Sequence, residues 1–164
     1  MRRVALPILA AALALTVLAL PLGAAAHRGA AGSAAVVKVA FNKKLKRKIL
    51  VDAQGFTLYL FFQDTHGQSV CVDAYDHCQK IWPPLRSSDP PVAGPGARAS
   101  LLGTIPRDDG DRQVTYKGHP LYTDAGSTSL GIKPDLKPGQ IRGQGVFSYW
   151  YVVSPLGKAI RKSP

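Results

Sequence analysis

The chain contains no glutamate, and all ten of its acidic side chains are aspartates. A calcium loop of the EF-hand type ends in a glutamate, so Asp108, Asp109 and Asp111 around Gly110 predict a turn. A Gly-x-Ser-x-Gly nucleophile motif is also missing, and no two aspartates are placed together by sequence as an acid–base pair. These absences favour a non-enzymatic protein, with a wall-active enzyme as a third interpretation.

Long apolar runs are scarce, and the one long run lies at the N-terminus. Two arginines precede an uncharged apolar stretch at residues 4–23, and three alanines follow at residues 24–26. This pattern predicts a signal peptide over residues 1–26, with an uncleaved membrane anchor as the alternative. No cysteine lies near the predicted cleavage site, so we expect a secreted or envelope protein without a lipid anchor. No second apolar stretch reaches membrane-spanning length.

Acidic side chains are outnumbered by 21 lysines and arginines, for a net charge of +11. Loss of the two N-terminal arginines would leave a mature charge of +9. Such a charge favours a solvated, soluble surface, with anionic envelope polymers or lipid head groups as partners in the alternative interpretation. Aromatic residues do not interleave with the densest basic cluster, so we expect no specific nucleic-acid binding. That cluster consists of Lys43, Lys44, Lys46, Arg47 and Lys48.

Alternating apolar residues predict an all-β fold, a small barrel or sandwich of β-hairpins with one short helical turn. The strand of residues 57–62 is apolar on both faces, which is typical of a central, covered strand. A helical turn within residues 71–82 should end at Trp82, because prolines follow it. The remaining predicted strands are residues 36–41, 48–52, 113–116, 121–123 and 146–154, with a short closing strand through Ile160.

A short internal echo predicts two related units. Gly-x-x-Leu-Tyr occurs at residues 55–59 and again at residues 118–122, each time after a predicted hairpin turn. Two copies of one hairpin unit would bury a common core. We therefore expect a flexible leader at 27–35 and a single β domain at 36–164. Its half-repeats are about 36–85 and 100–160, joined by a Pro/Gly-rich connector at 86–99.

Several runs resemble a bacterial secreted repeat family of unknown function, also described as predicted lipoproteins with a Y-x4-D motif. The runs are residues 49–61, 82–85, 101–105, 107–110, 113–122 and 150–155. The motif residues are Tyr59, Phe61 and Asp64. The second copy departs from it, because Ser127 stands five positions after Tyr122. The resemblance implies secretion, repeats and an envelope location, and no established activity.

The motif residues have two interpretations. Tyr59 and Phe61 share one face of a strand and Asp64 follows its end, where a carboxylate often accepts backbone N–H groups and fixes a turn. Alternatively, aromatic rings and a carboxylate form a ligand-binding surface. The candidate ligand contacts are Tyr59, Asp64, Trp82 and Tyr122.

The two cysteines also have two interpretations. In an exported chain, Cys71 and Cys78 are expected to form a disulfide. The alternative is a zinc or copper site, with Asp73 and Asp76 near its ligands. Its candidate ligands are His66, Cys71, His77 and Cys78. The sequence thus predicts a secreted or envelope-associated binding or structural module without cofactor or metal. An exported redox or metal-handling protein that uses Cys71, Cys78 and His77 is the alternative, and the oligomeric state stays open.

Overall fold

The computed structural model describes residues 34–72 and 77–161. The predicted signal peptide and residues 27–33 of the predicted leader lie outside these residues. The described part is rich in strands and contains one four-residue α-helix, in agreement with the predicted fold class. The strands are β1 (Val36–Asn42), β2 (Arg47–Val51), β3 (Tyr59–Phe61), β4 (Val92–Ala93), β5 (Leu102–Pro106), β6 (Arg112–Tyr116), β7 (His119–Pro120) and β8 (Trp150–Val152). The helices are α1 (Cys78–Ile81) and the 3-10 turns η1 (Ala99–Leu101) and η2 (Val146–Ser148).

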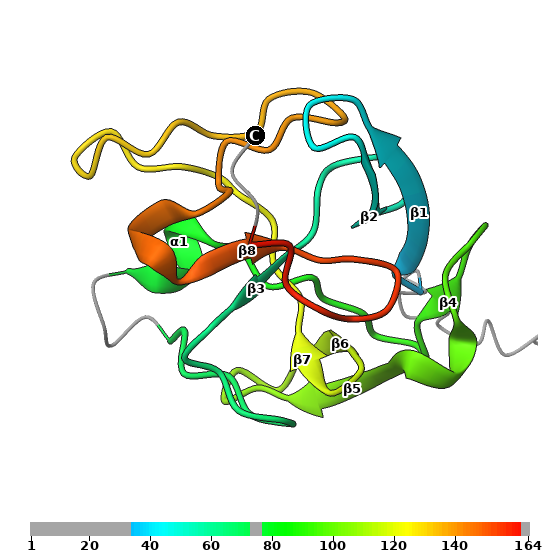
Figure 1. Ribbon diagram of the computed structural model, residues 1–164. Coiled ribbons are helices and arrows are strands. Elements are labelled where there is room, and N and C mark those ends of the chain that lie inside the picture. The colour runs from blue at the N-terminus through cyan, green and yellow to red at the C-terminus, as the bar shows by residue number, and fades with distance from the viewer. Residues whose placement is uncertain (1–33, 73–76, 162–164) are drawn as a thin grey trace, which may run out of the picture. The chain divides into compact units, whose positions relative to one another are not determined.

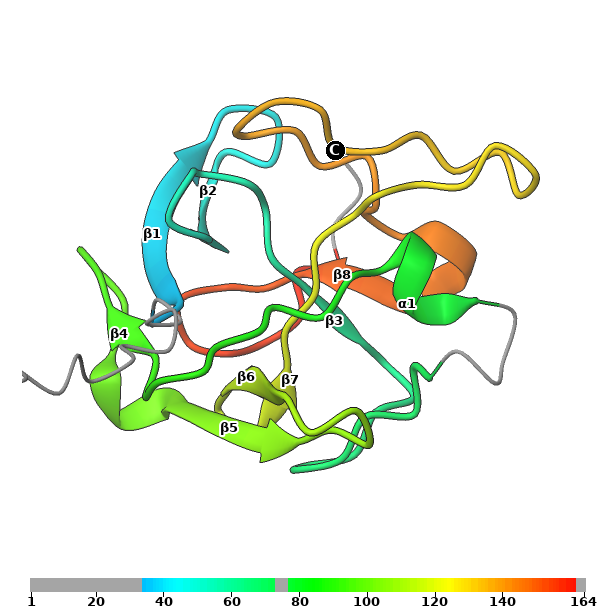
Figure 2. The ribbon, with the colours of Figure 1, turned by 180° about the vertical axis from the view of Figure 1, so that it is seen from behind.

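The strands form three small sheets, with orders β2-β1-β4, β3-β8 and β5-β6-β7. Both views of the ribbon show the β3-β8 pair crossing the middle of the fold, between the other two sheets (Figures 1 and 2). The described strands do not close into a barrel. Because the β3-β8 pair lies between the other two sheets, it carries apolar side chains on both of its faces.

Those two faces belong to two separate core clusters. Leu58 and Leu60 pack with one cluster, which includes Val114 and Leu121 of the second half of the chain. Tyr59 lies in the other cluster with both tryptophans, and Phe61 packs against it. The expectation that this strand is covered on both faces is therefore confirmed, but β3 spans only Tyr59–Phe61 and lies in a two-stranded sheet, so it is not the central strand of its sheet.

The basic cluster spans the hairpin turn between β1 and β2, with Lys43, Lys44 and Lys46, and the start of β2, with Arg47 and Lys48. The Asn42 carboxamide oxygen accepts the Leu45 N–H at 3.0 Å, which closes the turn. Leu45 is buried beneath it, and the lysine and arginine side chains around it are exposed. The next turn is also as expected, because the Asp52 carboxylate accepts the N–H groups of Gln54 and Phe56. After this turn β3 leaves the sheet of β2 and pairs with β8.

Several predictions about the second half were wrong. Among the described residues, the strand expected at 121–123 is absent, since β7 is His119–Pro120, and the expected closing strand through Ile160 is only an isolated bridge between Val153 and Ala159. Only Trp150–Val152 forms a strand within the segment expected at 146–154. The segment bends before this strand, because Phe147 and Ser148 have φ angles of 50° and 59°, in the left-handed region. The connector expected at 86–99 contains β4, which pairs in parallel with β1. Two apolar residues in a row carry too little pattern to predict that strand.

Candidate functional site

The two tyrosines of the internal echo lie side by side in the core. The Tyr59 N–H donates to the Tyr122 carbonyl at 2.9 Å, and the Tyr122 N–H donates to the Tyr59 carbonyl at 3.0 Å. Both side chains are completely buried. The contact joins two segments 63 positions apart, so the echo residues connect the two halves directly.

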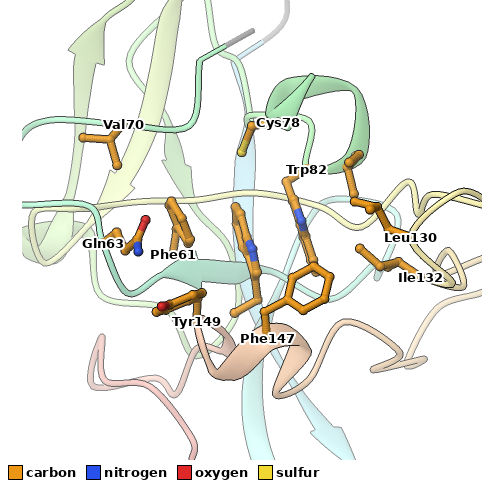
Figure 3. Close-up of a pocket in the computed structure, with 11 residues that line it drawn as sticks. Phe61, Gln63, Val70, Cys78, Trp82, Leu130, Ile132, Phe147 and Tyr149 are labelled. Atoms are coloured by element: carbon orange, nitrogen blue, oxygen red, sulfur yellow. The ribbon is translucent and has the colours of Figure 1, made fainter. Parts of the chain in front are cut away.

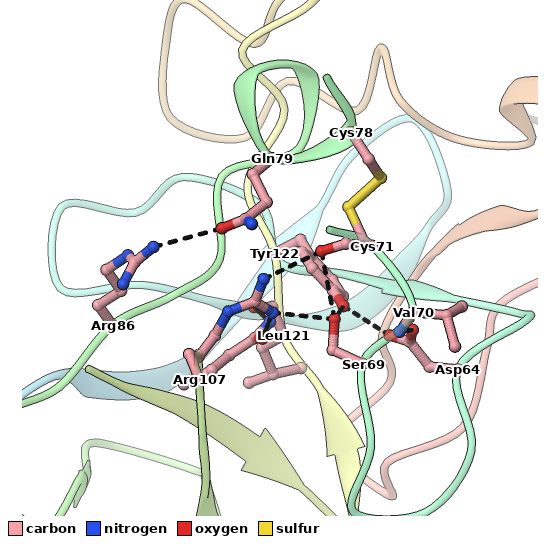
Figure 4. The surroundings of a disulfide bond; sticks show 11 residues. Asp64, Ser69, Val70, Cys71, Cys78, Gln79, Arg86, Arg107, Leu121 and Tyr122 are labelled. Carbon is pink, nitrogen blue, oxygen red and sulfur yellow. Dashed lines mark hydrogen bonds between the residues drawn. A yellow bond between two sulfur atoms is a disulfide. The ribbon is translucent and has the colours of Figure 1, made fainter. Parts of the chain in front are cut away.

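The motif aspartate binds the tyrosine of the other half. The Tyr122 hydroxyl donates to Asp64 Oδ2 at 2.7 Å, and Asp64 Oδ1 accepts the Val70 N–H at 2.8 Å (Figure 4). Asp64 therefore fixes the loop that follows β3, as one of its two interpretations predicted. Its hydroxyl partner is Tyr122, although Tyr59 precedes it in the Y-x4-D motif.

Asp135 plays the same part for Tyr59. The Tyr59 hydroxyl donates to Asp135 Oδ2 at 2.6 Å, and Asp135 Oδ1 accepts the Arg142 N–H at 2.8 Å. The sequence did not reveal Asp135, because the motif spacing points to Ser127. Each tyrosine thus binds an aspartate of the other half of the chain, and we call Tyr122–Asp64 and Tyr59–Asp135 the crossed pairs. In each pair one carboxylate oxygen accepts the tyrosine hydroxyl and the other accepts a backbone N–H of the loop that follows the aspartate.

Burial changes the ionisation of these groups. Burial raises the pKa of Asp64 to about 6. Burial and the charge of Asp135 raise the pKa of Asp124 to about 7, and burial also raises the pKa of Asp135. Within the described part of the chain, Asp124 Oδ2 is buried and accepts no hydrogen bond. Burial likewise raises the pKa values of Tyr59 and Tyr122, so both phenols stay protonated as donors.

The crossed pairs occupy most of the candidate ligand contacts. The tyrosines are 0% exposed and their hydroxyls are bound to carboxylates, so a ligand would reach Tyr59 or Tyr122 only by opening the core. Asp64 is buried and uses both of its oxygens. Trp82 and Asp64 each line a pocket, although their side chains are only 2% and 9% exposed.

A stack of three rings lies next to the crossed pairs. The Phe61 and Trp150 rings are 4.4 Å apart at 12°, and the Trp150 and Trp82 rings are 4.0 Å apart at 7°. Tyr59 meets Trp82 edge-on at 5.6 Å, and Tyr122 meets Trp150 edge-on at 5.1 Å. Each crossed tyrosine thus supports one tryptophan, and aromatic pairs of this geometry stabilise a core beyond their buried area.

One face of this stack forms the wall of a groove of about 500 Å³ (Figure 3). Phe147 and Tyr149 extend from η2 and its end toward the rings, and they are 58% and 44% exposed. Among the described residues, the lining includes no charged side chain. It consists of Phe61, Gln63, Val70, Cys78, Ile81, Trp82, Leu130, Ile132, Phe147, Tyr149 and Trp150.

The predicted disulfide between Cys71 and Cys78 is present and borders the groove. Arg107 holds the chain before it, since its guanidinium donates to the Cys71 carbonyl at 3.0 Å and to Ser69 Oγ at 2.9 Å (Figure 4). Ser69 Oγ lies 2.7 Å from the Tyr122 hydroxyl. Hydrogen bonds of Arg107 and Ser69 thus connect the disulfide, which borders the groove, to the crossed pair of Tyr122 and Asp64.

The disulfide also bears on the alternative metal site. Disulfide-bonded cysteines are not thiolate ligands, and the described residues contain no group of three or more side chains placed to hold a metal. His66 lies beside His119, with ring centroids 4.5 Å apart, and His77 is exposed at the start of α1. Asp73 and Asp76 lie outside the described residues.

The fold and site define a small β-rich protein in which two similar segments share one core and support an aromatic groove. Residues 46–86 and 103–131 match the model of a family described as a secreted repeat of unknown function, which confirms the predicted resemblance. No curated protein and no solved structure matches the chain. Asp135, η2 and Trp150 lie beyond the matched residues.

The family description and the disulfide fit an extracytoplasmic location. In residues 34–72 and 77–161, no helix has the length and hydrophobicity needed to cross a bilayer.

Proposed function

We propose that the protein is a non-enzymatic binding module outside the cytoplasm, whose groove takes a small, uncharged and largely apolar ligand with a flat ring. The observation that carries this proposal is the pair of stacked tryptophans that lines the groove beneath an exposed aromatic rim. A flat apolar ring would stack on this rim and displace water from it.

The dimensions and chemistry of the groove support this class of ligand. Pockets for small molecules measure roughly 300–1,000 Å³ and are lined mainly by apolar and aromatic side chains with few polar groups. The groove measures about 500 Å³ and has Gln63 and the Tyr149 hydroxyl as its main polar groups. A charged ligand would lose its hydration there without gaining an ionic partner.

The backbone of the rim supports a binding role as well. Phe147 and Ser148 both adopt the left-handed conformation, which costs about 1–2 kcal/mol per residue for L-amino acids. This strain holds an exposed phenylalanine at the entrance of the groove and gains little buried surface. Strain of this kind gathers at functional sites.

The proposal also covers the location of the protein and its contacts with anionic polymers or lipids. We place the module in the bacterial cell envelope after cleavage of residues 1–26, without a lipid anchor. Anionic envelope polymers or lipid head groups would contact the exposed basic turn at residues 43–48. Such contacts should weaken as salt rises, because exposed charges are screened over about 10 Å at about 0.1 M. Vesicle binding that does not respond to salt would contradict them.

The groove is tested with N-phenyl-1-naphthylamine, an uncharged aromatic dye that fluoresces in apolar sites. Both tryptophans of the chain line the groove, so energy transfer from tryptophan to dye reports binding to the protein, and the variants below locate the site. The double variant Phe147→Asn/Tyr149→Ser should bind the dye about tenfold more weakly, because each lost ring contact contributes about 0.5–1.5 kcal/mol.

The matched control removes two exposed apolar side chains elsewhere. Phe41 and Leu156 are 62% and 50% exposed and do not line the groove. Phe41→Asn/Leu156→Ser should bind the dye like the wild type. Equal losses in both double variants, or no energy transfer in the wild type, would contradict the proposal.

A further inference from the structure

A second pocket, of about 370 Å³, has a different chemistry from the groove. It lies where the loop after β3, the β6-β7 turn and the segment after β8 meet. Basic side chains come from all three: His66, Lys117, His119, Lys158 and Arg161. We propose that this pocket binds a tetrahedral oxyanion, the phosphate or sulfate group of a small ligand.

The permanent charges of the pocket favour an anion. Lys117, Lys158 and Arg161 are fixed cations with exposed side chains, and Asp64 is the one carboxylate of the lining. Its two oxygens already accept hydrogen bonds from Tyr122 and from the loop backbone, and its side chain is buried. The positive charges of the three cations therefore exceed the charge of Asp64, whose two oxygens are already hydrogen-bonded within the core.

Arg161 is held over the pocket by an aromatic ring. Its guanidinium lies 4.3 Å from the centroid of Phe62, a favourable cation–π distance. The planar guanidinium still has N–H donors that match the oxygens of an oxyanion. The Lys117 ammonium on the adjacent β6-β7 turn adds a compact second positive charge.

The two histidines are brought together by close contact between the halves of the chain. The Gly67 N–H donates to the Gly118 carbonyl at 2.9 Å, which joins the two loops. A side chain at Gly118 would collide with the His66 ring. The imidazoles of His66 and His119 therefore lie side by side from different segments, with ring centroids 4.5 Å apart and planes tilted by 55°.

The ionisation of His119 responds to the charges around it. Burial, and next the charges of His66 and Lys117, lower the pKa of His119. Lys158, Arg161 and Asp64 are the other charged groups of the lining. A bound oxyanion would stabilise the imidazolium form and raise this pKa. By linkage, the anion should then bind more tightly as pH falls through the histidine range.

The experiment is an NMR titration of the histidine ring signals with sodium sulfate, at ionic strength kept constant with chloride. Sulfate keeps the same charge between about pH 5.5 and about pH 8, so a change in its affinity reports on the protein. We expect saturable shifts at His66 and His119, and tighter binding at the lower pH. A parallel titration with inorganic phosphate shows which of the two oxyanions the pocket prefers.

The variant Lys158→Gln/Arg161→Gln removes two exposed cations from the pocket and should weaken sulfate binding about fivefold or more. Lys43→Gln/Lys44→Gln removes the same charge from the β1-β2 turn and should change it less than about twofold. Non-saturable shifts, or equal weakening in both variants, would overturn the proposal. Sulfate-insensitive signals that respond only to zinc would also overturn it. Dye binding in the groove is measured separately, so either site can fail alone.

Discussion

Asp124 and Asp64 make the stability of the fold depend on pH near neutrality. The folded pKa of Asp124 is about 7, and that of Asp64 is about 6, both above the ordinary value of 3.8. The folded chain therefore holds these protons more tightly than the unfolded chain. Their contribution to stability is complete below about pH 4 and is lost as pH rises through about 6 to 7.

We therefore predict that the free energy of unfolding is lower at about pH 8 than at about pH 5, by at least about 1 kcal/mol. His119 opposes part of this change, because its lowered pKa favours the folded state as pH rises. Asp124→Asn should reduce the difference, measured by urea unfolding at both pH values. A difference of unchanged size in this variant would show that Asp124 is not its source.

Replacement of Phe147 by asparagine should weaken dye binding without lowering the free energy of unfolding. Asparagine tolerates the left-handed conformation better than phenylalanine, and the ring that is removed is mostly exposed. Phe147→Asn should thus leave the free energy of unfolding within about 0.5 kcal/mol of the wild type, or raise it, while dye affinity falls. A loss of stability without a loss of affinity would give Phe147 a structural role.

At the scale of single elements, the disulfide closes a short loop in front of α1. The chain-entropy account gives about 2.5 kcal/mol for a loop of about eight residues. We predict a loss of this size for Cys71→Ser/Cys78→Ser in urea unfolding. Dye affinity should fall too, because Cys78 lines the groove. Thiol titration of denatured, unreduced wild type should find no free thiol, and two free thiols would contradict the bridge.

The elements predicted well were those with strong local patterns. Alternating apolar residues indicated the strand at Tyr59, and the prolines after Trp82 indicated the end of α1. The predicted strand at 146–154 failed in its first part because a run of aromatic residues has high strand propensity in any context. Backbone hydrogen bonds between residues 145 and 150 close a left-handed turn there, which strand propensity does not predict.

At the scale of the whole molecule, the sequence revealed the two related segments but not how they join. Its echo pointed to Tyr59 and Tyr122, which pair as neighbours. The crossed hydrogen bonds were not predictable, because Asp135 lies outside the motif spacing and Asp64 was expected to accept only backbone N–H groups. The groove was also missed, since Phe147 and Tyr149 at its rim lie far from the motif.

The central claim is that the two segments are locked together by tyrosine–aspartate pairs that cross between them. A double-mutant cycle on the free energy of unfolding tests it, with Asp64→Ala combined in turn with Tyr122→Phe and Tyr59→Phe. We predict a coupling energy of about 1–2 kcal/mol for Asp64 with Tyr122, and less than about 0.5 kcal/mol for Asp64 with Tyr59. Coupling to Tyr59 instead, or to neither tyrosine, would contradict the crossed arrangement.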